Sequence, residues 1–344
     1  MLSPKENLLR VIFHQNPEWV PYGLESTIWL YPPYIEQPSQ AGYDSFGVLW
    51  DYKKSAEGSS YPARNGHTIE DIHKWRQQIT IPDVDKMDWG RITLDWGYGG
   101  EVARLDEIDR ENHLVCGICE FGLFERSYLL LGMEAALINY ITEPDRMKEL
   151  ISAIADFKIA VIKRFYEVAK PDIIWFGDDW GTQINLFMHP QVWRQIIKPH
   201  LKRVYDCMKE RGLIIEQHSC GRIESVFGDI VELGAHIWNP CQPCNNLAEL
   251  KRKYGGKIAF EGGIDSQFVL ARPDVTVKEV RQEVRKRIDE MADGGGYIAL
   301  PSHDVPYNPE ILFAMEDEIR TYGRRYYQEK TRSNVKLTKI ERYL

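Results

Sequence analysis

The sequence predicts a single (β/α)8-barrel (TIM barrel) domain over residues 1–344. From about residue 112 onward, short apolar runs alternate with long stretches of helical periodicity. Strand and helix alternating at this spacing indicate parallel strands joined by right-handed crossovers. The candidate strands number eight, the count that closes such a sheet into a barrel. An open doubly wound sheet is the alternative, but no G-x-G-x-x-G motif follows the first strand.

The expected strands come in two groups. Two of them, Val20–Leu24 and Asp44–Trp50, lie near the amino terminus. The other six are His113–Ile118, Asp172–Phe176, Leu213–His218, Ala235–Asn239, Lys257–Glu261 and Tyr297–Leu300. Apolar residues three and four apart predict helices between the later strands, for example over 147–161 and 277–291.

Two segments do not follow the alternation. Residues 51–111 are polar and rich in Trp, Tyr and Asp, which predicts an insertion between strands two and three. Insertions of this length serve as lids, hairpins or interaction surfaces, and all three remain open. Residues 329–344 are charged and lysine-rich, which is typical of a solvated terminal helix or tail.

Composition excludes some classes of function. The formal charge is −8 and no long basic block is present, which disfavours nucleic-acid binding. No run of eighteen apolar residues suits a membrane span, and the amino terminus leads into an amphipathic helix rather than a signal peptide. We expect a cytoplasmic protein with a small-molecule or protein partner, and homodimerisation stays open.

Six cysteines are too few for a disulfide framework in a chain of this length. The two C-x-x-C pairs, Cys116/Cys119 and Cys241/Cys244, have the spacing of a zinc ribbon. The first pair lies in an apolar run that resembles a buried strand, where cysteine is a small apolar residue. We therefore favour core thiols over a ribbon.

The sharpest local signal is the segment from Glu216 to Gly221 at the end of the fifth expected strand. Side chains alternate along a strand, so Glu216, His218 and Cys220 project to one face. Catalytic groups are expected at the carboxyl ends of barrel strands. Imidazole nitrogen and thiolate sulfur are ligands of catalytic zinc. The alternative is a hydrogen-bonded histidine beside a buried thiol.

Other strand ends supply further candidates. His303 follows the last strand and is available as a third metal ligand; a loop histidine capped by Asp304 is the alternative. Of the adjacent Asp178 and Asp179, one must point inward, where it could orient a substrate or accept a proton; simple helix capping is the alternative. Glu261 could be another zinc ligand, a general base or an ion-pair partner.

Several segments together resemble the uroporphyrinogen decarboxylase superfamily over nearly the whole chain. They are Ser3–Arg10 with Trp19–Pro21, Asp172–Gly181, His189–Arg203, and Asn239-Pro240 through Gly262–Asp265. The resemblance implies a barrel whose reaction site lies at the carboxyl ends of its strands.

The corrinoid-dependent methyltransferase branch of that superfamily binds zinc through an H-x-C motif and a later cysteine. His218 and Cys220 match the motif, and His303 or Glu261 stands in for the missing cysteine. The resemblance thus implies zinc-dependent transfer of a methyl group from a small methylated substrate, such as an aryl methyl ether, to a corrinoid protein. Asp178, Asp179 and Glu261 would orient groups or handle protons.

The decarboxylase branch is the alternative, and it implies no metal. Asp51, Tyr128 and His303 occupy places similar to its substrate-binding aspartate, tyrosine and histidine. However, its arginine-rich segment corresponds here to Ser26–Tyr34, which has no basic residue to pair with a polycarboxylate. An aromatic wall formed by that segment would suit an uncharged methyl donor better. A hydrolase or lyase, and a non-catalytic binding module, remain rivals.

Overall fold

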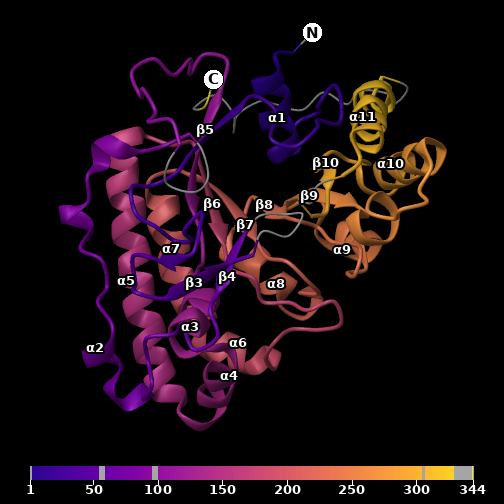
Figure 1. Cartoon of the computed structure of the whole chain (residues 1–344). Coiled ribbons are helices and arrows are strands. Elements are labelled where there is room, and N and C mark those ends of the chain that lie inside the picture. The colour runs from indigo at the N-terminus through magenta and orange to yellow at the C-terminus, as the bar shows by residue number, and fades with distance from the viewer. Residues whose placement is uncertain (1, 54–58, 95–99, 304–306, 329–342, 344) are drawn as a thin grey trace.

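The computed structural model describes residues 2–53, 59–94, 100–303, 307–328 and 343. Its centre is a seven-stranded parallel sheet with the order β1-β5-β6-β7-β8-β9-β10 (Figure 1). The strands are β1 (Thr27–Leu30), β5 (Leu114–Cys119), β6 (Ile173–Gly177), β7 (Ile214–His218), β8 (Ile237–Asn239), β9 (Ala259–Ile264) and β10 (Tyr297–Pro301). Most of their residues are buried, as expected of a parallel sheet covered on both faces.

The sheet curls into a TIM-barrel-like shape because its two edges come close together. At the β10 edge, Tyr22 forms a parallel bridge with Ala299. The N–H of Gly23 donates to the carbonyl of Ala299 at 2.9 Å, and the N–H of Ala299 donates to the carbonyl of Pro21 at 3.0 Å. The chain then enters β1, the opposite edge strand, at Thr27. The predicted fold class is therefore confirmed.

Helices cover the outside of the sheet, with α3, α4, α5 and α7 on one side and α9, α10 and α11 on the other (Figure 1). The helices that follow strands are α3 (Leu123–Leu131), α4 (Met133–Thr142), α5 (Pro144–Ala169), α6 (Pro190–Ile196), α7 (Lys198–Glu210), α8 (Glu224–Leu233), α9 (Leu247–Tyr254), α10 (Val277–Met291), α11 (Pro309–Glu318) and α12 (Arg324–Tyr326). Single π turns occupy Ser266–Leu270 (η4) and Ile319–Gly323 (η5). Among the described residues, no helix is both long and apolar enough to cross a membrane.

The amino-terminal helix α1 (Pro4–Ile12) closes one end of the barrel. Its apolar side chains pack against the first inward-facing residue of most strands in one buried cluster. That cluster includes Leu8, Leu9, Val11, Ile12, Leu114, Ile173, Ile214, Ile237, Ala259 and Ile298. A second core lies between the sheet and the outer helices. The amino ends of the strands are thus sealed, and the carboxyl ends remain to form a site.

The two amino-terminal strand predictions need correction. Asp44–Trp50 contributes no barrel strand, because β3 (Leu49–Tyr52) pairs with β2 (Gly42–Tyr43) and β4 (Ser60–Pro62) in a separate antiparallel sheet. The segment Val20–Leu24 forms a single bridge at Tyr22 instead of a strand. The barrel strand of this region is β1, so the insertion begins directly after Leu30 and not at residue 51.

The insertion is anchored to the barrel by buried charges. Beyond the three-stranded sheet, its described residues form the short helical turns η1 (Ile72–Lys74), α2 (Trp75–Gln78), η2 (Val84–Lys86) and η3 (Trp89–Arg91). Arg126 of α3 binds Asp44 and Glu36, each at 2.6 Å, and Lys158 of α5 also binds Glu36. These groups are almost completely buried, so they fix the insertion in one position.

The predicted tail at 329–344 lies outside the described residues except for Tyr343. The hydroxyl of Tyr343 donates to the carbonyl of Gly212 at 2.7 Å.

Candidate active site and metal centre

Three side chains from neighbouring strand ends converge at the carboxyl end of the barrel. Asp179 follows β6, His218 ends β7 and Cys220 follows β7. One potential ligand atom from each lies within 4.8 Å of the other two. His218 Nε2 lies 3.5 Å from Cys220 Sγ and 3.4 Å from Asp179 Oδ1. The arrangement brings together His218 and Cys220, as the sequence predicts, and adds Asp179.

The donor spacing fits a zinc ion. Zinc bonds of about 2.0–2.3 Å in a tetrahedral arrangement separate neighbouring ligand atoms by about 3.4–3.6 Å. The two distances measured from His218 Nε2 are 3.4 and 3.5 Å. Nitrogen, sulfur and one carboxylate oxygen are also the donor types that zinc takes in catalytic sites, where three protein ligands leave one position open. The residues present therefore suit this metal.

His218 is oriented by two neighbours. Its Nδ1 donates to Oδ1 of Asn239, the last residue of β8, at 2.6 Å, which leaves Nε2 directed toward Asp179 and Cys220. The ring of Trp175 packs against the imidazole, with 4.5 Å between centroids. Asn239 is thus a site residue that sequence reasoning missed. The alignment of His218 with Asn239 on adjacent strands is the structural feature that identifies it.

The adjacent aspartates have different roles. Asp178 is fully buried and accepts from the N–H groups of Leu123, Phe124 and Glu125 at the start of α3. Asp179 accepts from the N–H of Cys220 at 2.6 Å and faces His218. Asp178 therefore caps a helix, and Asp179 is the inward-pointing carboxylate. Burial raises the pKa of Asp178 to about 6.

The electrostatics of the site favour positive charge. Burial opposes the charged form of His218, but Cys220 and Asp179 together raise its pKa well above the usual value. Burial also opposes ionisation of Asp179, yet hydrogen bonding to His218 lowers its pKa. Glu120, directly after β5, is a second residue that the sequence analysis missed, and burial raises its pKa to about 8. A cation in this region would be surrounded by acidic groups.

A pair of carboxyl groups lies on the inward face of the strands below His218. Glu216 of β7 and Glu261 of β9 are 0% and 2% exposed. Burial raises the pKa of both carboxyl groups, and the negative charge of Glu261 raises the pKa of Glu216 further. Glu261 is not part of the metal-binding group and hydrogen-bonds the side chain of Asn239 instead.

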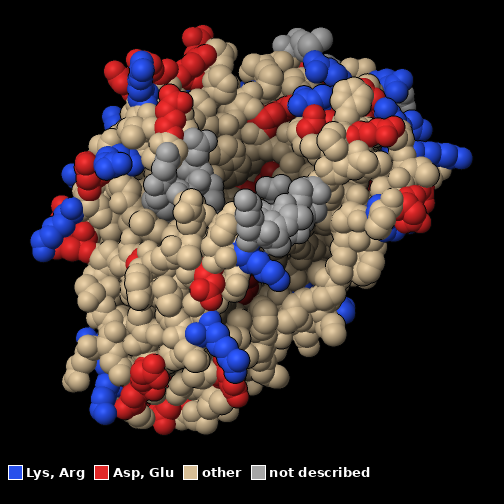
Figure 2. Space-filling model, in the orientation of Figure 1, with Lys and Arg blue, Asp and Glu red and all other residues tan. Residues whose placement is uncertain are grey.

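A cavity of about 590 Å3, here called the reaction cavity, opens beside these residues. The residues that line it include Asp179, His218, Cys220 and Asn239. Tyr22, Trp175, His303 and Tyr307 line it as well. The molecular surface shows a deep hollow with acidic atoms inside it (Figure 2). The aromatic rings in its lining are those of Tyr22, Trp175 and Tyr307. The predicted aromatic wall of Ser26–Tyr34 is not formed. Trp29 and Tyr31 pack against the interior cluster, and Tyr34 is buried in the outer core.

The remaining predicted site residues lie at different places. His303 lines the reaction cavity but is not part of the metal-binding group found among the described residues. Tyr128 lies on α3 and donates to Glu125 at 3.1 Å; it lines a different cavity. Asp51 is exposed in β3 and is not among the residues that line the reaction cavity.

The zinc ribbon weighed from the C-x-x-C spacing is not formed. Cys116 belongs to the interior cluster, whereas Cys119 and Cys241 belong to the outer core, so the side chains lie on opposite faces of the sheet. All six cysteines are free thiols. The preferred interpretation of the buried ones as core residues is confirmed.

Comparison with known proteins identifies relatives. Residues 125–322 match the family model "Uroporphyrinogen decarboxylase (URO-D)". The uroporphyrinogen decarboxylase of Actinobacillus succinogenes is 35% identical over 88 residues, which cover 24% of this chain and only 23% of that relative. The enzyme of the same name from Paraburkholderia xenovorans is 21% identical over 291 residues, or 82% of this chain and 75% of the relative.

Among solved structures, a methyltransferase from Methanosarcina mazei shares the fold with a TM-score of 0.63. The match covers 94% of this chain and 99% of that one, at 14% sequence identity. At 14% identity, the likeness shows a shared fold and carries no information about activity.

Proposed function

The chain belongs to the uroporphyrinogen decarboxylase (URO-D) family of enzymes, and we propose that it is a zinc-dependent methyltransferase. It would move a methyl group from a small, uncharged methylated substrate to a corrinoid carried by a partner protein. The observation that carries this proposal is the convergence of Asp179, His218 and Cys220 at the mouth of the barrel. The fold shared with a methyltransferase is consistent with it.

Asp179, His218 and Cys220 would hold the metal. When bound, zinc supplies Lewis-acid chemistry, polarising the heteroatom that carries the methyl group and stabilising it as a leaving anion. Asn239 holds His218 in the tautomer that presents Nε2, and the N–H of Cys220 fixes the carboxylate of Asp179. The aromatic rings of Tyr22, Trp175 and Tyr307 provide an apolar wall around the methyl group that would be transferred. His303, which lines the same cavity, would contact the substrate rather than the metal.

A decarboxylase is the second candidate, because the curated relatives reported above carry that name. A polycarboxylate substrate needs cations, usually arginine forks. The described residues that line the reaction cavity include no lysine or arginine. The chemistry of the cavity therefore favours an uncharged substrate.

Metal analysis tests the proposal directly. The purified protein should bind about one zinc per chain, and Asp179→Asn, His218→Ala and Cys220→Ser should each lower zinc affinity by at least about tenfold. Cys244→Ser is a matched control, because Cys244 is a free thiol outside the metal-binding group. Transfer from 2-methoxyphenol to cob(I)alamin, followed by absorbance, should fall in parallel with zinc content. A metal-free protein that releases carbon dioxide from uroporphyrinogen at full rate would show that the second candidate is correct.

A further inference from the structure

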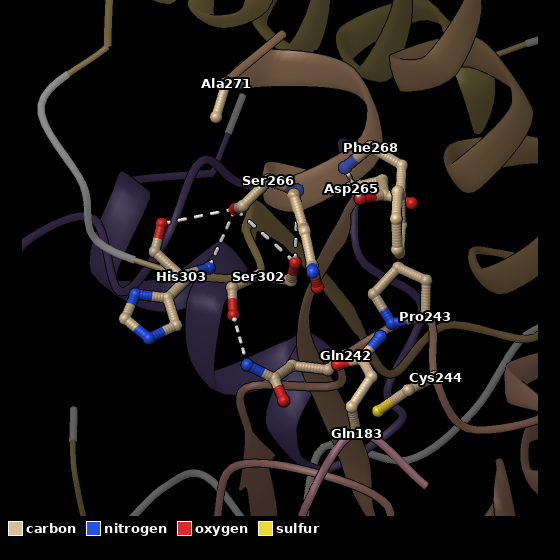
Figure 3. A pocket seen from close by; sticks show the side chains of 11 residues that line it. Gln183, Gln242, Pro243, Cys244, Asp265, Ser266, Phe268, Ala271, Ser302 and His303 are labelled. Carbon is tan, nitrogen blue, oxygen red and sulfur yellow. Dashed lines mark hydrogen bonds between the residues drawn. The ribbon is translucent and has the colours of Figure 1, made fainter.

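A second cavity, here called the accessory cavity, lies beside the reaction cavity. It has a volume of about 470 Å3, a size typical of small-molecule sites. Its residues come from segments that follow four of the strands: Gln183, then Gln242–Cys244, then Asp265–Phe268 with Ala271, then Ser302 and His303 (Figure 3). Ser302 and His303 also line the reaction cavity, so the two cavities share a wall.

The shared wall is held together by hydrogen bonds. Ser266 Oγ accepts from the N–H of His303 at 2.9 Å and from the hydroxyl of Tyr307 at 2.6 Å. The amide of Gln242 donates to the carbonyl of Ser302 at 3.2 Å and accepts from the N–H of Gly221 at 2.6 Å. The imidazole of His303 turns away from Phe268, Pro243 and Cys244 (Figure 3). These polar groups are therefore used to build the wall rather than to bind a ligand.

The groups left for a ligand are an aromatic ring and two amides. Phe268 is 58% exposed although it is large and apolar, and it lies on the π turn η4, a feature frequent at functional sites. Pro243 and Ala271 extend the apolar lining. The side-chain amides of Gln183 and Gln267 make no hydrogen bond within the described parts of the chain, so they can bind polar substituents of a ligand.

The charge of the accessory cavity restricts its ligand. Among the described residues that line it, there is no lysine or arginine, and Asp265 is the single carboxylate. A carboxylated ligand would enter without a cation to pair with and would meet Asp265, which is unfavourable. An uncharged planar ring can stack on Phe268 without that cost.

We propose that the accessory cavity binds the uncharged aromatic body of the substrate and thereby selects neutral aromatic compounds over carboxylated ones. The inference rests on the proposed function in so far as this aromatic compound is the methyl donor. It adds a specificity-determining residue, Phe268, that lies outside the metal-binding group.

Calorimetric titration of the full chain tests the inference without any turnover. 2-Methoxyphenol should bind, and 4-hydroxy-3-methoxybenzoate, which adds a carboxylate, should bind at least about tenfold more weakly. Phe268→Ala should weaken binding of 2-methoxyphenol by about five- to tenfold. Phe313→Ala is the matched control, because Phe313 is 69% exposed and lines neither cavity. Gln183→Arg should strengthen binding of the benzoate by supplying a cation.

Two results would overturn the inference: affinity for 2-methoxyphenol that is unchanged in Phe268→Ala, or equal affinity of the unmodified protein for both compounds. The first of these, together with loss of binding in Trp175→Ala, would place the ring in the reaction cavity instead. Binding as described without any methyl transfer would refute the proposed function and leave the accessory cavity standing. Normal methyl transfer, together with an affinity for 2-methoxyphenol that is unchanged in Phe268→Ala, would refute the accessory-cavity inference and leave the proposed function standing.

Discussion

His218 presents Nε2 to the metal-binding group because of a chain of hydrogen bonds that begins at Glu261. The carboxylate of Glu261 is an acceptor, so the side chain of Asn239 turns its NH2 group toward it. The Oδ1 of Asn239 then faces His218 and accepts from Nδ1 at 2.6 Å. Outer hydrogen-bond partners of this kind commonly change metal affinity by about 10- to 100-fold.

Glu261→Gln should therefore weaken zinc binding by about tenfold or more. A glutamine can present NH2 to Asn239, which allows the Asn239 amide to flip and to donate to His218 Nδ1; Nε2 then carries the proton and loses its lone pair. Competition titration with a zinc chelator measures the effect. Glu318→Gln is the control. Glu318 is buried, as Glu261 is, but it lies on α11 and pairs with Arg281 and Arg285. The Glu318→Gln change should lower stability without altering zinc affinity. Equal zinc affinity of Glu261→Gln and the unmodified protein would contradict this account.

At the residue scale, sequence reasoning succeeded where strand alternation decides the outcome. His218 and Cys220 lie two apart at the end of a strand, and they meet in the structure. The choice between Asp178 and Asp179 depends on how the chain leaves β6, which no periodicity describes. Asn239 was missed because its role follows from the pairing of β7 with β8, a long-range contact. Where His303 lies depends likewise on hydrogen bonds of the last loop to Ser266.

The position of the insertion on the barrel depends on one arginine of α3. Arg126 is fully buried and binds two carboxylates of the insertion, Glu36 and Asp44, while its guanidinium packs over the ring of Phe46 at 4.3 Å. Removing one partner of a buried ion pair typically costs about 3–5 kcal/mol, since the other charge stays buried and uncompensated.

Arg126→Met should accordingly lower the free energy of unfolding by about 3–5 kcal/mol and expose the insertion to proteolysis. Urea denaturation and limited trypsin digestion measure the two effects. Arg104→Met is the matched control, because Arg104 forms an exposed pair with Glu107 in the same insertion. A change in Arg126→Met no greater than that of the control would show that the buried network does not hold the insertion.

Helix α9 carries a lysine whose charge is disfavoured. Burial lowers the pKa of Lys251 to about 8 from its ordinary value of 10.5, and its amine donates to the carbonyl of Gly295. The folded protein thus binds this proton less tightly than the unfolded chain. Stability contributed by this group therefore rises as the pH goes from about 8 to about 10.5.

Lys251→Met removes the titrating group, so the stability of the unmodified protein relative to the variant should increase between pH 8 and pH 10.5. The shift amounts to at most about 3 kcal/mol. Denaturant unfolding at a series of pH values measures it. Lys253→Met, an exposed change on the same helix, is the control for the loss of a lysine side chain. A Lys251→Met difference that is constant across this range would refute the argument.

At the scale of elements, the later strands were predicted well and the first two were not. Strands β5 to β10 are buried runs separated by long helical patterns, and both signals are local. Asp44–Trp50 has the alternation of a strand, which is equally suited to an antiparallel hairpin; the pairing of Trp50 with Gly42 and Pro62 decides between them. β1 is only Thr27–Leu30 and lies between turn-forming residues, so its own sequence is too short to indicate a barrel strand.

In the molecule as a whole, the residues that stabilise the barrel and the residues of the candidate site lie at opposite ends of the barrel axis. One end is filled by α1, whose leucines pack against Ile173, Ile214 and other strand-start residues. The other end carries the metal-binding group, the reaction cavity and the accessory cavity. This division is the usual one in TIM-barrel enzymes, in which the amino-terminal face serves stability and the carboxyl-terminal face serves function. A core substitution at the sealed end should leave the site intact.

Leu9→Ala tests this separation. Leu9 is fully buried between α1 and the strand starts, and replacing a buried leucine with alanine costs about 2–5 kcal/mol, because apolar contact is lost and a cavity remains. The melting temperature should fall by several degrees. At temperatures where the variant is still folded, zinc affinity and the affinity for 2-methoxyphenol should match those of the unmodified protein within about twofold. If either affinity fell as steeply as in Cys220→Ser or Phe268→Ala, the two ends would be mechanically coupled, and α1 would have to be counted among the elements that shape the site.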